Sequence, residues 1–282
     1  MADIRTIALP DGENIPALGI GTWNLGDRRQ ARADEIAALQ MAVDLGMTVV
    51  DTAEMYGNGA AEELVAEALA HRRSKVFLVS KVLPQNATRR GTIAACEASL
   101  RRLKTDRLDM YLLHWRGSVP LDETLEAFGR LRGDGKIRHW GVSNLDVDDM
   151  EEIEALEAGV GSRIAINQVL YNLTRRGIEH DLLPWCRTRG IPVMAYSPIE
   201  QGRLARRKAL QTIASRLRAT PAQVALAWIL RQPGVMAIPK SGHVERVREN
   251  HAAINMQLAP DDLAELDDAF PPPTRKIPLE MI

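Results

Sequence analysis

Four residues of this chain carry side chains that could together protonate a carbonyl oxygen as it gains negative charge: Asp51, Tyr56, Lys81 and His114. A free tyrosine has a pKa of about 10 and is too weak an acid for fast proton transfer at neutral pH. A nearby lysine ammonium is expected to lower that pKa, and a carboxylate is expected to fix the lysine. A neutral imidazole could hydrogen-bond the carbonyl oxygen and orient it for attack.

Three of these residues end short apolar runs, and this placement would bring them together. The runs are Thr48–Asp51, Val76–Lys81 and Met110–His114, and Tyr56 lies in the loop that follows the first run. Burying an ionisable group is costly unless it is paired, so three such ends in succession favour a site. The alternative is a structural ion pair at the rim of the fold, with the imidazole bonded to the backbone.

A metal site is the other chemistry that aspartate and histidine at strand ends could serve. The six histidines of the chain form no HxH or HExxH pair. A lysine in the middle of the set would also repel a divalent cation. We therefore expect no metal.

A second group of residues, after the last apolar run, could bind an anion. Lys240 and Ser241 lie in a loop, and a helix is expected from Val244, which places Arg246 in its first turn. Backbone N–H groups at a helix N-terminus attract phosphate, and barrels frequently bind phosphate after their last two strands. The alternative is a solvated basic patch paired with nearby glutamates.

Three other run ends, Ser143-Asn144, Asn167-Gln168 and Tyr196-Ser197, offer amides and hydroxyls. A carboxamide ring needs both donors and acceptors, and the flat ring of Tyr196 could stack on it. The alternative is that these side chains only cap turns. Taken with the acid–base and phosphate groups, they imply a bound nicotinamide dinucleotide that delivers a hydride.

The elements that must position these residues repeat along the chain as an apolar run followed by an amphipathic segment. The expected strands are Leu18–Gly21, Thr48–Asp51, Val76–Lys81, Met110–His114, His139–Ser143, Ala165–Gln168, Pro192–Tyr196 and Met236–Pro239. The expected helices include Asp34–Leu45, Ala60–Ala70, Arg89–Leu103, Thr124–Arg132, Val147–Ala158 and Pro221–Arg231, whose apolar residues fall at three- and four-residue spacing.

Eight such units predict an α/β fold, a (β/α)8 TIM barrel, as one domain over residues 1–282. The segments Ile4–Ala8 and Asn14–Ala17 are expected to form a β-hairpin that plugs one end. A doubly wound open sheet is the alternative, but it usually carries GxGxxG in its first turn, and here Gly19-Ile20-Gly21 is followed by Gly26.

Charge and cysteine content bound the function further. The 36 Lys and Arg residues balance 37 Asp and Glu residues, for a net charge of −1, which argues against a general nucleic-acid or membrane-surface binder. The chain has two cysteines in no CxxC pattern, which argues against a disulfide framework and against a cysteine zinc site. With no apolar signal segment at the start, the expected location is cytoplasmic.

The motifs that carry these residues resemble those of the aldo-keto reductase superfamily. They are DTAEMYGNG, LVSKV, YLLHW, GVSN, INQV, AYSP and IPKSGHVERVREN, in the family's order and spacing, from about Pro16 to about Asp268. Within the superfamily, the chain looks most similar to small bacterial reductases of methylglyoxal and related dicarbonyls.

The resemblance implies a role for each matching residue. Tyr56 would be the proton donor, tuned by Lys81 and Asp51, and His114 would orient the carbonyl. The implied cofactor-binding residues are Gly21, Thr22, Ser143, Asn144, Gln168, Tyr196, Ser197, Lys240, Ser241, Arg246, Glu249 and Asn250, the last two facing the adenosine. The implied substrate-binding residues are Trp23, Tyr56, His114 and Trp115.

This chain departs from the family pattern in two places. Gly242-His243 stands where relatives often have an aliphatic residue and a threonine, which bears on the preference for NADPH over NADH. The segment Ile199–Lys208 is short, so a cofactor would be loosely covered.

The expected function is NADPH-dependent reduction of small aldehydes and α-dicarbonyls by a cytoplasmic monomer that binds a small-molecule carbonyl substrate, without nucleic-acid or membrane partners. One rival is a cofactor-binding redox sensor or scaffold that turns over slowly, like the β subunits of potassium channels. Another is a (β/α)8 isomerase or metal hydrolase, which predicts no nicotinamide binding.

Overall fold

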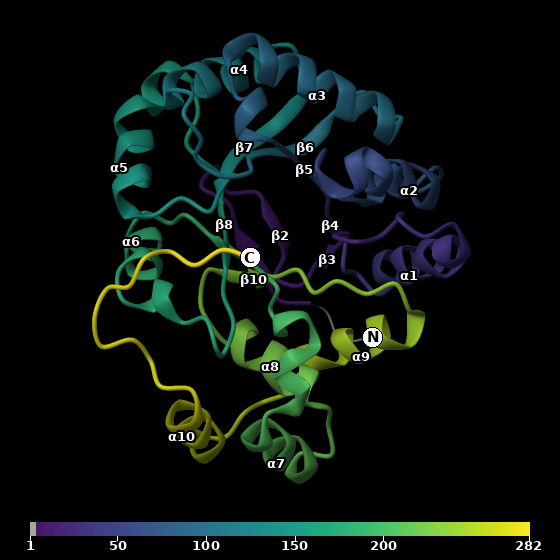
Figure 1. Ribbon diagram of the computed structural model, residues 1–282, viewed down its shortest axis with the longest axis vertical. Coiled ribbons are helices and arrows are strands. Elements are labelled where there is room, and N and C mark those ends of the chain that lie inside the picture. The colour runs from purple at the N-terminus through teal and green to yellow at the C-terminus, as the bar shows by residue number, and fades with distance from the viewer. Residues whose placement is uncertain (1–3) are drawn as a thin grey trace.

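Eight parallel strands surround the centre of the molecule in the computed structural model, which describes residues 4–282 (Figure 1). Their bounds are β3 (Ile20–Gly21), β4 (Val49–Asp51), β5 (Phe77–Val82), β6 (Leu108–Leu113), β7 (Ile137–Ser143), β8 (Asn167–Leu170), β9 (Val193–Tyr196) and β10 (Val235–Ala237). They pair in the order β10-β9-β8-β7-β6-β5-β4-β3. Parallel bridges Leu18–Ala237 and Gly21–Lys240 join the two edges, so the predicted barrel is confirmed.

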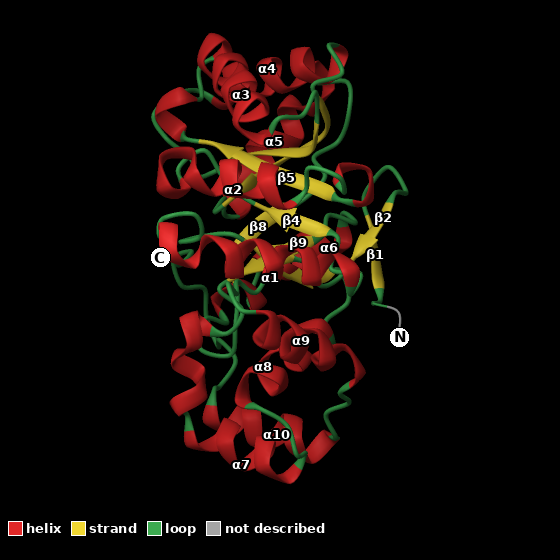
Figure 2. Cartoon of the chain, turned by 90° about the vertical axis from the view of Figure 1, so that its right-hand side faces the viewer, coloured by secondary structure: helices red, strands yellow, loops and turns green. Residues whose placement is uncertain are grey.

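Helices follow the strands and cover the outside of the barrel (Figures 1 and 2). They are α1 (Arg32–Asp44), α2 (Ala60–Ala68), α3 (Arg89–Leu103), α4 (Leu121–Gly133), α5 (Val147–Leu156), α6 (Leu182–Thr188), α7 (Lys208–Arg216), α8 (Pro221–Leu230), α9 (Val244–Ala252) and α10 (Pro260–Ala269). Thr220 caps α8, since its hydroxyl accepts from the Gln223 N–H and Pro221 opens the first turn. None of the helices in the described part of the chain could cross a membrane.

The two-residue period of the strands explains why polar groups meet inside the barrel. Val49, Val79 and Leu112 belong to the apolar cluster that fills the lumen. Because alternate residues of a strand point to the same face, Asp51 and Lys81 continue two of these inward rows toward the carboxyl ends of the strands. His114, one residue beyond β6, continues the row of Met110 and Leu112. The same alternation that packs the core thus places the polar residues in one layer above it.

A hairpin closes the other end of the barrel, as predicted. Strands β1 (Thr6–Ala8) and β2 (Asn14–Pro16) pair antiparallel, with Ile7 opposite Ile15. Both isoleucines belong to the apolar cluster of the lumen. Figure 2 shows this hairpin at one end of the barrel and the C-terminal residue at the other.

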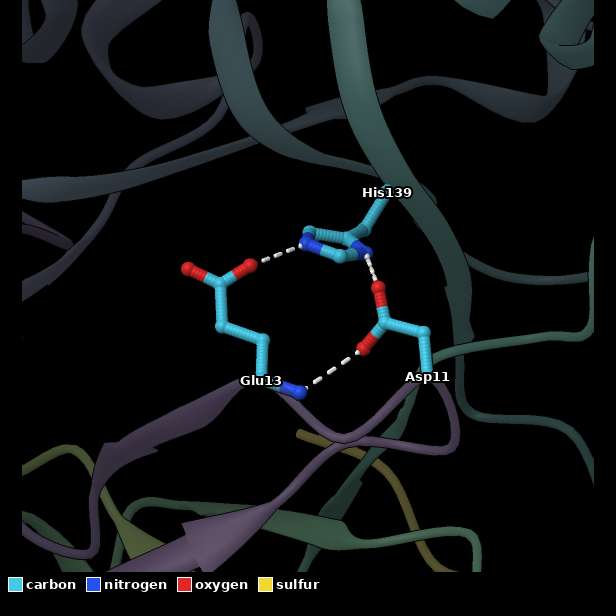
Figure 3. A group of neighbouring side chains, drawn as sticks. All are labelled: Asp11, Glu13 and His139. Atoms are coloured by element: carbon cyan, nitrogen blue, oxygen red, sulfur yellow. Dashed lines mark hydrogen bonds and ion pairs between the residues drawn. The ribbon is translucent and has the colours of Figure 1, made fainter.

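One histidine ties this hairpin to the barrel wall (Figure 3). On β7, the His139 Nε2 lies 2.6 Å from Glu13 Oε2, and its Nδ1 lies 3.4 Å from Asp11 Oδ2. These atoms are of the type that binds metals. Arg138 also pairs with Glu13 at 2.5 Å, and its positive charge would oppose a cation there. We therefore assign the three side chains to anchoring the hairpin.

Candidate active site

A cavity of about 840 Å³ opens at the carboxyl ends of the strands. The residues predicted for the site that line it are Gly21, Trp23, Asp51, Tyr56, His114, Trp115, Ser143, Asn144, Gln168, Tyr196, Ser197, Lys240, Ser241, Arg246, Glu249 and Asn250. Two predicted residues are not part of this lining. Lys81 lies behind Tyr56 with its side chain fully buried, and the Thr22 hydroxyl donates to the Asp51 carbonyl at 3.0 Å.

The Lys81 ammonium joins the proposed acid–base residues. It donates to Asp51 Oδ2 at 2.8 Å, to the Thr52 carbonyl at 2.9 Å and to the Tyr56 hydroxyl at 3.1 Å. The Asp51 side chain is 3% exposed and the lysine 0%, so the ion pair is shielded from water. The rings of Tyr56 and His114 meet edge to face, with centroids 5.8 Å apart. The structure thus brings all four residues together beside the cavity.

The net direction of the Tyr56 shift differs from the sequence expectation. Burial raises the pKa of the phenol above its ordinary value, and the positive charge of Lys81 only partly offsets this. For Lys81, burial acts to lower the pKa, but Asp51 and Tyr56 together raise it above its ordinary value. The phenol is therefore held protonated at neutral pH beside a fixed ammonium. A phenol held in this way gives up its proton only when a strong base, such as a nascent alkoxide, is present.

His114 is held neutral. Burial, followed by the positive charge of Lys81, lowers the pKa of His114 to about 2. Its Nδ1 is buried and has no hydrogen-bond partner within residues 4–282. An unpartnered buried ring nitrogen costs free energy in a purely structural role, so the interpretation of His114 as satisfied by the backbone is not supported. A neutral imidazole can still hydrogen-bond a carbonyl oxygen.

The loop that carries Tyr56 packs closely against Arg102 of α3. Gly57, Asn58 and Gly59 have φ values of 56°, 51° and 96°, so three successive residues adopt the left-handed region. A Cβ on Gly59 would lie 2.4 Å from Cδ of Arg102, whose Nε donates to the buried Glu62 at 2.5 Å. The Asn58-Gly59 turn therefore packs against α3 and supports the loop that carries Tyr56.

The amide side chains predicted to hold a carboxamide already form hydrogen bonds to other residues of the site. Asn144 Nδ2 donates to the His114 carbonyl at 3.1 Å, and its Oδ1 accepts from the Tyr196 hydroxyl at 3.0 Å. Gln168 Nε2 donates to Asp51 Oδ1 at 2.8 Å. Gln168 therefore also positions the carboxylate that holds Lys81, a role that its place in the sequence did not indicate.

The predicted phosphate end carries cations that have no carboxylate partner within residues 4–282. Lys240 and Arg246 both line the cavity, and neither forms an ion pair there. Burial lowers the pKa of Lys240; Arg246 adds to the lowering, whereas Glu35 opposes it. Bringing like charges together is unfavourable until an anion compensates them. This end of the cavity therefore fits a phosphate, and the interpretation as a paired surface patch is not supported.

Sequence reasoning missed several of the residues that line the cavity. They are Asn24, Met55, Pro198, Ile199, Gln201, Gly202, Ala205, Ala222, Ile238, Met281 and Ile282. Met281 and Ile282 belong to the C-terminal tail, and no local pattern in the sequence shows where that tail runs. Ile199, Gln201, Gly202 and Ala205 belong to the segment Ile199–Lys208, which the family resemblance indicates as the cover of the cofactor without naming its individual residues.

Comparisons with known proteins match these observations. A model of the aldo/keto reductase family matches residues 17–270. Methylglyoxal reductase YeaE of Escherichia coli strain K12 is 50% identical over 274 residues, which cover 95% of this chain and 96% of that protein. Glyoxal reductase of Bacillus subtilis strain 168 is 33% identical over 262 residues, covering 93% and 91%. The solved structure of an aldo/keto reductase from Klebsiella pneumoniae in complex with NADP and acetate has a TM-score of 0.95 at 48% identity and covers 99% of this chain and 100% of its own.

Proposed function

The chain belongs to the aldo/keto reductase family, and from this premise we propose that it reduces small aldehydes and α-dicarbonyls such as methylglyoxal to alcohols with NADPH. The observation that carries the proposal is the contact of one buried ammonium with both a carboxylate and a phenol at the cavity floor. NADPH, when bound, supplies the hydride that adds to the carbonyl carbon. Tyr56 then gives its proton to the carbonyl oxygen, so that C–H and O–H bonds form as the C=O π bond is lost.

Each of the other residues contributes to that proton transfer. The Lys81 ammonium stabilises the Tyr56 phenolate as it forms, and Asp51 keeps the ammonium in place. His114 donates a hydrogen bond that holds the carbonyl oxygen near the phenol.

Ser143, Asn144 and Gln168 would hold the carboxamide of the cofactor, with Tyr196 against its ring. Gly21 and Ser197 would support it from the strand ends, whereas Thr22 acts indirectly, through its hydrogen bond to the Asp51 carbonyl.

The apolar border of the cavity supports an uncharged substrate such as an aldehyde. Trp23, Met55 and Trp115 border it on the side of Tyr56. These side chains give the cavity an apolar border that holds no charged group to bind a large polar ligand. The named reductases of methylglyoxal and glyoxal among the relatives favour turnover over the rival role of a redox sensor.

We also propose that the protein is a cytoplasmic monomer. The large apolar side chains exposed in the described residues are Trp23, Met55, Ile277, Met281 and Ile282, and all except Ile277 border the cavity. Few are therefore left over for a subunit interface. Cys96 and Cys186 are buried and free, as is usual in a reducing compartment.

The test of the proposed reaction is NADPH oxidation by the purified chain with methylglyoxal and with glyoxal. We expect many turnovers per protein molecule and formation of an alcohol in equal amount to the NADPH consumed. Binding of NADPH without turnover on either compound, or on a panel of aliphatic and aromatic aldehydes, would instead favour the sensor.

A second expected result concerns the phosphate end. Arg246→Ala should raise the KM for NADPH by about 10- to 100-fold, since a charge-assisted hydrogen bond contributes about 1.5–3 kcal/mol. The KM for NADH, which lacks the 2′-phosphate, should change little. Arg248→Ala is the matched control, because Arg248 is an exposed cation on the same helix outside the cavity lining. Equal losses for NADPH and NADH would place the 2′-phosphate elsewhere.

A further inference from the structure

Two segments that are far apart in the sequence border the mouth of the cavity. The loop after β9, residues 197–207, contributes Ile199, Gln201 and Gly202 to its lining. The C-terminal tail, residues 271–282, contributes Met281 and Ile282. Figure 1 shows the tail running past α6 to the centre of the barrel. Both segments therefore lie where they can contact a ligand in the cavity.

One side chain contacts both segments. Arg175 belongs to a tight turn after β8, closed by a hydrogen bond from its N–H to the Asn172 carbonyl at 2.9 Å. Its Nη1 donates to Glu280 Oε1 of the tail at 2.5 Å, and its Nη2 lies 3.4 Å from Glu200 Oε1 of the 197–207 loop. A single guanidinium on a fixed turn thus bridges two carboxylates on the two sides of the mouth.

The loop needs such contacts to keep its conformation. Glu200, Gln201 and Gly202 have φ values of 49°, 54° and 84°, and left-handed backbone at a residue other than glycine persists only where the surroundings hold it. The Glu200 carboxylate is buried and accepts from Asn172 Nδ2 at 2.7 Å and, within the loop itself, from Arg203 Nη2 at 2.9 Å. The turn after β8 therefore holds this strained loop through two side chains, those of Asn172 and Arg175.

Near its end the tail has other contacts as well, the packing of Leu279 on the core and a backbone hydrogen bond of Ile282 with Tyr196. Met281 and Ile282 are 55% and 54% exposed, so apolar packing fixes them weakly. Further back along the tail than Leu279, Lys276 pairs with Asp146 and Asp181 at 3.2 and 3.0 Å, at the N-termini of α5 and α6. Glu280 is thus the last polar contact before the two residues that line the cavity.

We propose that Arg175 is a positioning residue that couples the substrate-side tail to the loop over the cofactor, so that loosening one loosens the other. The inference rests on the proposed function, because it assumes that NADPH binds under the 197–207 loop. Glu280 holds the guanidinium where it reaches Glu200. Without Glu280 the long arginine side chain is free to leave Glu200, and the strained loop loses one of its supports.

The test changes a residue of the tail and measures the rate at which NADPH is released. Glu280→Gln should release NADPH about 2- to 5-fold faster than the wild type in a stopped-flow fluorescence experiment, the range that a partly exposed ion pair supports. Its KM for methylglyoxal should also rise. Arg175→Met should accelerate release at least as much, and the double variant no further, because both changes remove the same bridge. Lys276→Gln, which removes the other anchor of the tail, should leave NADPH release unchanged.

Two results would overturn the coupling. One is an unchanged rate of NADPH release in Glu280→Gln, whether or not Arg175→Met releases NADPH faster than the wild type. The other is acceleration by Lys276→Gln as large as that by Glu280→Gln, which would mean that any loosening of the tail suffices. Failure of the proposed function is distinguishable, because it is measured on the wild-type protein, which would then show either no NADPH fluorescence change or such a change without turnover of methylglyoxal.

Discussion

A Tyr56→Phe variant is expected to lose about 10²- to 10⁴-fold of its turnover number with methylglyoxal while binding NADPH nearly as well as the wild type. The substitution removes only the hydroxyl that accepts from Lys81 Nζ and that would protonate the substrate oxygen. Phenylalanine keeps the ring that meets His114 edge to face. The shape of the cavity is therefore preserved while the acid beside Lys81 is removed.

The measurement pairs steady-state kinetics with a fluorescence titration of NADPH. Tyr111→Phe is a matched control, since it removes a buried tyrosine hydroxyl that has no hydrogen-bond partner within residues 4–282 and lies outside the cavity lining. We expect the control to keep full turnover. If Tyr56→Phe kept turnover within a few-fold of the wild type, the proton would have to come from another group.

The sequence was sufficient to predict the barrel and the clustering of its polar residues, because both follow from the alternation of inward- and outward-facing residues along each strand. In β5, Phe77 and Val79 point into the lumen, and Lys81 is the next residue of that row. Asp51 and His114 continue equivalent rows in neighbouring strands. A polar residue at the end of an inward row is visible in the sequence once the strands are recognised.

Other features depend on contacts that no local pattern encodes. The tail reaches the cavity through the contact of Glu280 with Arg175, two residues that are 105 positions apart. The direction of the Tyr56 pKa shift depends on how deeply the phenol is buried, and a sequence shows the neighbouring charges but not the loss of water. The second role of Gln168, on Asp51, likewise requires the closure of the barrel, which brings β8 and β4 to the same lumen.

A Lys81→Met variant is expected to lose both stability and turnover. The substitution leaves the Asp51 carboxylate buried with Gln168 as a remaining side-chain donor. Removing one partner of a buried ion pair costs about 3–5 kcal/mol, because the other charge stays in a medium of low dielectric constant. The midpoint of urea denaturation should fall accordingly, with an unchanged slope of the transition. Turnover should fall as well, since nothing then stabilises the phenolate of Tyr56 as it forms.

The double variant Asp51→Asn with Lys81→Met separates these two effects. It removes both charges at nearly constant volume, and the new amide oxygen can still accept from Gln168. Replacing a buried ion pair by neutral groups is often close to neutral for stability, so most of the lost denaturation midpoint should return. Turnover should stay as low as in Lys81→Met, because the ammonium beside the phenol is still missing. Recovery of turnover together with stability would show that the ion pair only supports the fold, and that Tyr56 acts without help from Lys81.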